Sequence, residues 1–182
     1  LHIPSHSFPT RRSSDLFNSS NANSKKTIKV KRIEELQTII KTMLINNKDG
    51  ILDLTHIDVS GITSFNELFK DKHNITSIDI STWETNELES CVSMFEGCIN
   101  LKEVNISNFN TKNLQSMKKM FKNCVELENI GNINNWNISS LKDASWAFYL
   151  CEKLNMNITS LNLESNGVKT FNINKYANGI KI

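Results

Sequence analysis

Apolar residues recur along the chain with a period of about 26 residues, and this pattern starts near residue 57. Three columns of apolar side chains keep the period with spacings of 26 or 27 residues: Phe69, Phe95, Phe121 and Phe148; Trp83, Phe109 and Trp136; and Cys98, Cys124 and Cys151. Columns that stay in register over several copies are the signature of a repeat architecture. The sequence therefore predicts four to five stacked units over residues 57–165, with these columns packed in the core.

Each unit has two halves with different periodicities. The first half alternates apolar and polar residues, as in 78–80 and 104–106, which predicts a short strand with one buried face. The second half carries apolar residues at i, i+3, i+7 and i+10, as over 88–98, which predicts one apolar stripe on a short helix.

A polar column just before each stripe predicts helix N-caps: Ser64, Ser90, Ser116 and Asp143. Glu67 follows Ser64 by three residues, as in a capping box. Stacking such units predicts an α/β fold, a leucine-rich-repeat-like solenoid with short parallel strands on one face, short helices on the other, and an N-terminal helical cap.

The segments outside the repeat have their own expected roles. Residues 28–56 are expected to form the cap as a strand, a helix over 32–46 and a second strand, because apolar residues there have helical spacing. Residues 17–27 read as a polar linker. Residues 166–182 either close the other end of the stack or mark a truncation.

Residues 1–16, LHIPSHSFPTRRSSDL, resemble the translation of a common sequencing adapter. Two of the three arginines of the chain, Arg11 and Arg12, lie in this stretch. We therefore interpret residues 1–16 as foreign and disordered, and we expect the natural N-terminus to be missing. The alternative is a natural flexible tail.

The repeat itself resembles a known family. Its pattern, Leu-x-x-[Ile/Val]-[Asp/Asn]-Ile-Ser-x-[Trp/Phe] followed by Met-Phe-x-x-Cys, is clearest at residues 94–101 and 120–127. This pattern resembles the BspA-type leucine-rich-repeat family of bacterial surface proteins, also catalogued as a bacterial domain of unknown function. The resemblance implies a right-handed solenoid, often on the cell surface of host-associated bacteria, and for some members adhesion to host matrix proteins or other cells. The fourth copy departs from it, with Trp146-Ala147-Phe148 in place of Ser-Met-Phe.

Composition excludes several classes of function. The formal net charge is only +2 and no cluster of Lys and Arg stands out, so nothing indicates a nucleic-acid partner. No apolar run approaches the roughly 20 residues that cross a bilayer, so we expect no transmembrane segment in this chain. The abundance of Asn and Lys beside scarce Arg indicates an AT-rich bacterial genome.

The cysteines are the main candidates for chemistry. No Cys-x-x-Cys pair is present, so the sequence predicts no zinc site. We expect the cysteines to be buried small apolar side chains. The alternatives are a disulfide and a catalytic thiol, Cys91 with His73 as its base. Carboxylate pairs such as Glu87/Glu89 are typical of a solvated face. We therefore predict no catalytic residue, no metal, no cofactor and no enzymatic activity.

The outward side of the predicted strands is the remaining candidate for a binding surface. Stacked polar side chains should form a ridge there, which consists of Ser77, Asp79, Ser81, Glu103, Asn105, Ser107, Asn132, Asn134, Asn162 and Glu164. Repeat proteins use such extended surfaces for partners, so the sequence favours a protein-binding or adhesion module of a surface or secreted protein that binds another protein or a host-surface molecule. The alternatives are a plain solvated sheet face on a structural spacer or intracellular scaffold, and a cysteine-dependent hydrolase.

Overall fold

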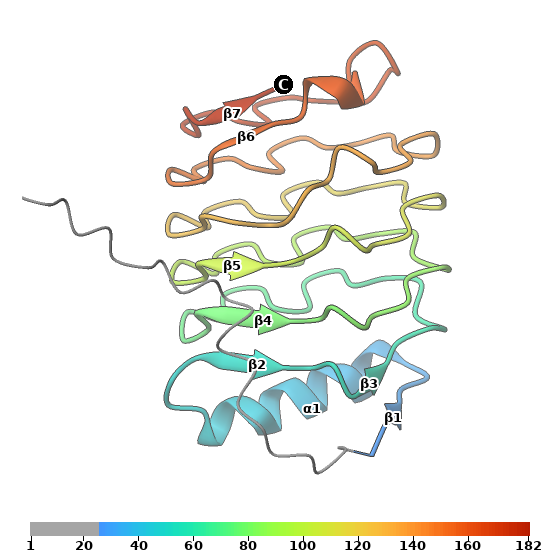
Figure 1. The fold of residues 1–182 in the computed structure, drawn as a ribbon, viewed down its shortest axis with the longest axis vertical. Helices are drawn as coiled ribbons and strands as arrows, with labels where there is room; N and C mark the ends of the chain where they lie inside the picture. Colours follow the sequence, from blue (N-terminus) through green and yellow to red (C-terminus); the bar gives the residue numbers. More distant parts are fainter. Residues whose placement is uncertain (1–25) are drawn as a thin grey trace, which may run out of the picture.

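The computed structural model describes residues 26–182 of the chain. Over these residues the chain winds into a stack of flattened loops that follow one another in sequence order along the long axis (Figure 1). We call each winding, which corresponds to one repeat, a coil. Residues 1–16 and nearly all of the linker 17–27 lie outside the described residues, so the structure does not bear on their interpretation.

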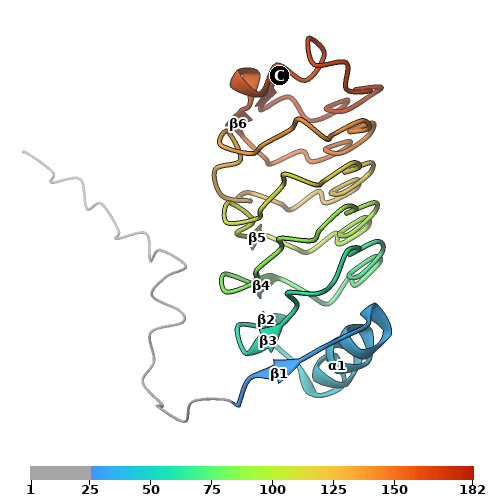
Figure 2. The same ribbon diagram turned by 90° about the vertical axis from the view of Figure 1, so that its right-hand side faces the viewer.

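A helix lies across the N-terminal end of the stack (Figures 1 and 2). The chain passes from β1 (Ile28–Lys29) into α1 (Ile33–Asn46), which is where the apolar spacing predicts a helix, and then into β2 (Ile51–Asp53) and β3 (Ile57–Asp58). Glu34 and Glu35 lie in the first turn of α1, where negative charge is favourable to the helix dipole. Leu36 and Ile40 on its inner face are fully buried, so α1 covers the end of the core.

The first half of each repeat forms short parallel strands. β2 pairs with β4 (Ser77–Asp79), and β4 pairs with β5 (Glu103–Val104), in a register that joins Ile51 to Ser77 and Ser77 to Glu103. A second small sheet pairs β1 with β3, and a third pairs β6 (Met156–Asn157) with β7 (Ile180–Lys181). Equivalent residues of successive repeats therefore lie directly above one another.

The predicted fold class is wrong in the second half of the repeat, where helices were expected. Among the described residues the only α-helix is α1, and the only other helical element is a 3-10 turn, η2 (Thr159–Leu161). The polar column predicted to cap helices instead forms isolated parallel bridges from coil to coil: Ser64 with Ser90, Ser90 with Ser116, Ser116 with Asp143, and Asp143 with Lys169. Residues 26–182 form one α-helix with small parallel sheets and stacked turns, and not an α/β leucine-rich-repeat solenoid.

Left-handed backbone conformations explain why no helix forms. Glu67, Ser93 and Lys119 occupy one column and have φ of 58°, 55° and 58°, which a right-handed helix cannot contain. The chain forms overlapping tight turns instead, such as the one in which the amide of Leu68 donates to the carbonyl of Phe65 at 3.2 Å. Glu67 therefore lies inside a turn and does not complete a capping box.

Amide groups of these turns donate to the next coil and not within a helix. The amide nitrogens of Phe69, Phe95 and Phe121 each donate to a carbonyl oxygen one coil later, at Met94, Met120 and Ala147 respectively, all at 2.8 Å. The turns thereby satisfy their backbone groups between coils, as strands do. The apolar residues whose spacing predicts a helix still point into the core, because the turns bury the same residues.

The predicted core columns are all buried. The phenylalanine rings form a ladder: Phe69 and Phe95 stack with centroids 5.2 Å apart, Phe95 and Phe121 at 5.0 Å, and Phe121 and Phe148 at 5.9 Å. The indole nitrogen of Trp83 donates to the carbonyl of Leu54 at 3.2 Å, so this buried polar group has a partner.

The last coil has a different register from the one that the sequence suggests. Residues 158–163 resemble residues 75–80 in sequence, which suggests that Ile158 is equivalent to Ile75. The amide of Leu161, however, donates to the carbonyl of Ile158 at 3.0 Å, as Trp83 donates to Ile80 at 3.1 Å. Ile158 is therefore equivalent to Ile80. The connection that leads from the preceding turns into this strand is shorter than in the earlier coils, and the local sequence likeness of residues 158–163 to 75–80 does not show this.

Residues 166–182 complete this last coil and end in β7, which pairs with β6. The amide of Ala177 donates to the carbonyl of Asn174 at 2.9 Å, as Cys151 donates to Phe148 at 3.1 Å. Asn174 therefore occupies the phenylalanine column and Ala177 the cysteine column. These two replacements make this coil difficult to recognise from the sequence.

Candidate functional site

Some polar side chains of the predicted strand ridge form hydrogen bonds within the turns that follow the strands. The side-chain oxygens of Asp79, Asn105 and Asn132 each accept a hydrogen bond at 3.0 Å from the amide two residues later. This is an Asx turn, which bends the chain away from the end of each strand. These three side chains have a structural role that their position alone explains.

Other ridge residues do not form the expected continuous surface. The register of β4 and β5 brings Ser77 beside Glu103, but Ser77 is buried and its hydroxyl donates to Glu103 at 3.4 Å. Asn162 follows η2 in a left-handed conformation, and Glu164 lies in a cavity at the end of the stack. Because Ile158 is equivalent to Ile80, Asn162 and Glu164 do not lie on the strand face. Ser81 and Ser107 follow the ends of β4 and β5, and Asn134 follows the isolated bridge at Asn129.

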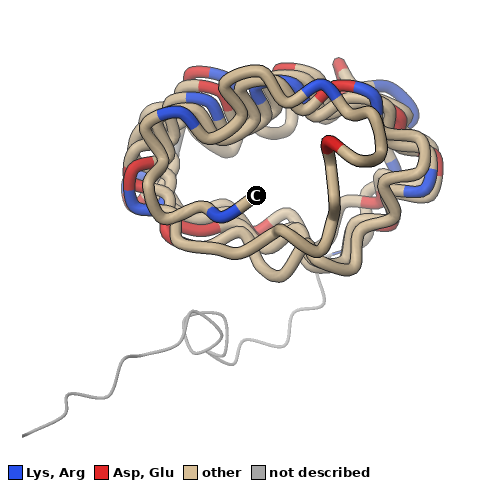
Figure 3. Tube along the Cα trace, turned by 90° about the horizontal axis from the view of Figure 1, so that it is seen from above, with Lys and Arg blue, Asp and Glu red and all other residues tan. Residues whose placement is uncertain are grey.

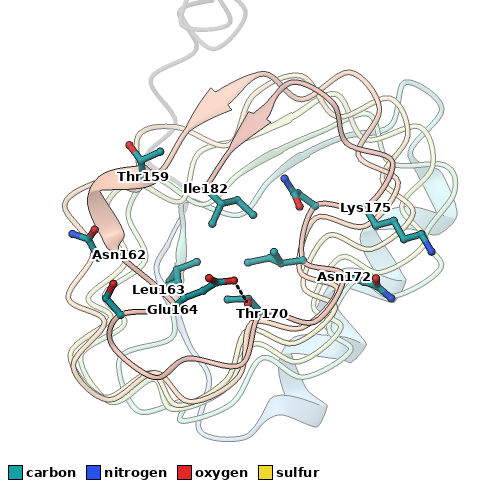
Figure 4. Close-up of a pocket in the computed structure, with 11 residues that line it drawn as sticks. Thr159, Asn162, Leu163, Glu164, Thr170, Asn172, Lys175 and Ile182 are labelled. Carbon is teal, nitrogen blue, oxygen red and sulfur yellow. Dashed lines mark hydrogen bonds between the residues drawn. The ribbon is translucent and has the colours of Figure 1, made fainter.

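The cavity that holds Glu164 opens at the C-terminal end of the stack and has a volume of 660 Å³. Figure 4 shows Leu163, Glu164 and Ile182 directed toward its interior, while Asn172 and Lys175 lie on its rim. The Glu164 carboxylate accepts a hydrogen bond from Thr170 at 3.0 Å. The lining contains neither cysteine nor histidine, so no thiol or imidazole lies in this cavity beside the carboxylate.

The cysteines are buried free thiols. Burial raises the pKa of Cys98 to about 12 and that of Cys151 to about 12. Burial also raises the pKa of the fully buried Cys91, whereas His73, its suggested base, is exposed. These thiols remain protonated near neutral pH, which does not favour nucleophilic chemistry.

Metal ligands are not grouped in residues 26–182, where no set of three or more His, Cys, Asp and Glu side chains could hold a metal ion. Charged residues of both signs lie interleaved around the outside of the coils (Figure 3). The distribution of charge alone therefore does not single out a site.

Aromatic and basic side chains gather on the turns of the last three coils. We call this surface the aromatic–lysine face, and it consists of Lys118, Lys119, Lys122, Trp146, Tyr149, Phe171, Lys175 and Tyr176. Trp146 and Phe171 form an edge-on pair with ring centroids 5.0 Å apart, and Tyr149 and Tyr176 form a second pair at 5.6 Å. Phe171 is 64% exposed and Tyr176 is 54% exposed.

The ladder of turns places these residues together. The amide of Trp146 donates to the carbonyl of Phe171 at 3.0 Å, and the amide of Lys119 donates to the carbonyl of Ser145 at 2.9 Å. Side chains that are about 26 residues apart therefore lie side by side on adjacent coils. The scaffold fixes the spacing of the face, as a sheet fixes the spacing of its side chains.

The lysines of the face lie against the rings and around a shallow cavity. The ammonium group of Lys118 lies 5.6 Å from the ring centroid of Trp146, and that of Lys175 lies 5.2 Å from that of Tyr176. Lys122 forms an ion pair with Glu96, with an N–O distance of 3.0 Å. The cavity has a volume of 560 Å³ and is lined by Lys118, Lys119, Lys122, Asn123, Trp146 and Tyr149.

The sequence interpretation missed this face because its members do not form a column of one residue type. The position of Trp146 is taken by Glu67, Ser93 and Lys119 in earlier coils. The available signal was the departure of Trp146-Ala147-Phe148 from the repeat, which places a large aromatic at an outward position. A helical interpretation of this segment gave that tryptophan no particular direction.

Comparison with known proteins gives a family and no function. Residues 12–103 and 63–178 match a family described as "Mycoplasma protein of unknown function, DUF285". No curated protein and no solved structure matches the chain. The resemblance to BspA-type repeats is not confirmed by this match. Within residues 26–182 no helix combines the length and apolar character needed to cross a membrane. Because the two matched segments together cover most of its length, the chain belongs to the DUF285 family.

Proposed function

We propose that the chain is a protein-binding repeat module of a bacterial surface or secreted protein and that it binds its partner through the aromatic–lysine face. The observation that carries this proposal is the exposure of Phe171 and Tyr176 beside Trp146 and Tyr149. Clusters of large exposed side chains are uncommon on folded surfaces unless they contact a partner, and aromatic residues dominate the energetics of protein interfaces.

The scaffold beneath the face favours binding. Each outward side chain is carried by a turn that is hydrogen-bonded to a neighbouring coil, so the backbone does not have to be ordered when a partner arrives. Preorganisation of this kind lowers the entropic cost of association. The strand ridge is a weaker candidate, because its Asp79, Asn105 and Asn132 side chains are engaged in turns.

We propose that the module binds its partner and does not catalyse a reaction. Cys91, the suggested nucleophile, is fully buried, and the thiol pKa values are raised by burial. A hydrolase would need a thiol that can reach solvent and ionise. The proposed location at the cell surface is favoured by the likeness of the repeat to bacterial surface-protein repeats.

The proposal is tested with a panel of purified extracellular-matrix proteins immobilised on a biosensor. We expect the chain to bind at least one of them and the double variant F171S/Y176S to lose most of that binding. The matched control is S81A/E103Q on the strand ridge, which should bind as the unmodified chain does. Circular dichroism checks that each variant is folded. Loss of binding in the ridge variant alone, or binding to no member of the panel, would contradict the proposal and favour a structural spacer.

A further inference from the structure

We propose that the aromatic–lysine face recognises an acidic peptide segment that carries a large apolar side chain next to its carboxylates. This inference rests on the proposed function and specifies the chemistry of the partner. Two properties of the face lead to it: its local charge and the way its rings are already packed.

The local charge of the cavity is positive. Lys118, Lys119 and Lys122 line it, and no acidic residue does. Lys122 is neutralised by Glu96, whereas no ion pair involves Lys118 or Lys119 within residues 26–182. Lys175 adds a further positive charge beside Tyr176, which contacts Tyr149 at the cavity wall. Complementary charge therefore belongs on the partner.

The packing of the rings argues against nucleic acid. Single-stranded nucleic acids stack their bases on open aromatic faces. Here Trp146 has Lys118 over its ring and Phe171 against it in an edge-on contact, and Tyr176 is engaged in the same way by Lys175 and Tyr149. Phe171 keeps most of its surface exposed and can receive an apolar side chain from a peptide.

The experiment uses fluorescence anisotropy with the full chain and a labelled synthetic peptide of alternating glutamate and leucine or phenylalanine. The comparison probes are the same peptide with glutamine in place of glutamate, a labelled oligothymidylate and a heparin oligosaccharide. We expect the acidic peptide to bind most tightly, and its affinity to fall as salt concentration rises. The triple variant K118Q/K119Q/K175Q should lower that affinity by about tenfold or more.

A matched variant separates the site from net charge. K31Q/K41Q/K48Q removes the same charge from exposed positions around α1 and should leave the affinity unchanged. The inference is overturned if both triple variants weaken binding alike, if the glutamine peptide binds equally well, or if the oligothymidylate or heparin binds more tightly.

Light scattering provides a further check on the occupant of the face. Self-association through this face would mean that a second copy of the chain, and not an acidic peptide, is its partner. If matrix-protein binding is lost in F171S/Y176S but no acidic peptide binds, this inference fails while the proposed function stands.

Discussion

The thiol of Cys124 donates a hydrogen bond of 3.0 Å to the carbonyl oxygen of Phe95, which lies 29 residues earlier in the chain and one coil below. That carbonyl also accepts the amide of Cys98 at 3.0 Å. Cys98 and Cys151 make the same contact with the carbonyls of Phe69 and Phe121. A cysteine is small enough for this buried position and brings a donor to a carbonyl of the neighbouring coil, which explains why the cysteine column follows the phenylalanine column.

The burial of the thiols predicts their reactivity. We expect all four cysteines of the folded chain to be protected from iodoacetamide at mildly alkaline pH, because burial raises the pKa of Cys98 to about 12 and excludes the reagent. Mass spectrometry should find complete labelling once urea unfolds the chain. Rapid modification of Cys91 in the folded state would contradict its position in the core.

The phenylalanine ladder should be a major source of stability. Phe95 lies between Phe69 and Phe121, with ring centroids 5.2 and 5.0 Å away, and it is fully buried. We expect Phe95→Ala to lower the free energy of unfolding by about 3–5 kcal/mol, because it removes buried apolar surface and leaves a cavity in the stack. Urea denaturation measures this loss. The control Phe171→Ala removes the same side chain from an exposed position and should change stability far less.

The sequence predicts the repeat, its core columns and the helix α1 well, because each depends on which residues are buried. It does not predict the turns. An apolar stripe at i, i+3 and i+7 points inward both on a helix and on a series of tight turns, so burial periodicity cannot separate the two. The feature that distinguishes the turns from a helix is the left-handed backbone at Glu67, Ser93 and Lys119, and these residue types do not predict such a conformation. In the neighbouring column Asp71, Gly97 and Asn123 are residue types that adopt it more readily.

The binding surface was harder to predict for a related reason. Polar alternation identifies the outward side of a strand, but it does not show that Asp79 or Asn105 is occupied by its own turn. The aromatic–lysine face joins residues from three coils, and its position depends on the register of the turns. Trp146 was visible in the sequence only as a departure from the repeat.

Gly97 offers a direct test of turns against helix. In a helix, Gly97→Ala would raise stability by about 1 kcal/mol. In this structure Gly97 has φ of +76° and a β-carbon there would meet the carboxylate of Asp71, so we expect the same change to lower stability by about 1 kcal/mol or more. The sign of the change in urea denaturation decides between the two structures. A stabilised G97A variant would restore the helical interpretation.

The Asx turns predict which ridge residues are structural. Asn105→Ala should lower the free energy of unfolding by about 1 kcal/mol, because the amide and the hydroxyl of Ser107 lose their acceptor. Asn105→Asp keeps an oxygen in the same place and should be close to the unmodified chain. Ser81→Ala serves as the control and should stay within about 0.5 kcal/mol. Equal stability of N105A and the unmodified chain would return Asn105 to the list of residues available to a partner.

The ion pair between Glu96 and Lys122 predicts a pH dependence of stability. Burial alone would raise the pKa of Glu96, but hydrogen bonds from Ser93 and Lys122 and the lysine charge outweigh it and lower the pKa from 4.5. A carboxyl group whose pKa is lowered on folding stabilises the folded state at pH values above its unfolded pKa, and this contribution is lost as the pH falls through the folded pKa.

The stability advantage of the unmodified chain over Glu96→Gln should therefore be constant near neutral pH and shrink below about pH 4.5. Lys122→Gln removes one of the groups that lower the pKa, so the folded-state pKa of Glu96 moves closer to the unfolded value and the stability lost in acid should be smaller than in the unmodified chain. Urea denaturation at a series of pH values measures all three proteins, and parallel stability curves for E96Q and the unmodified chain through the acid range would show that the pair does not contribute in this way.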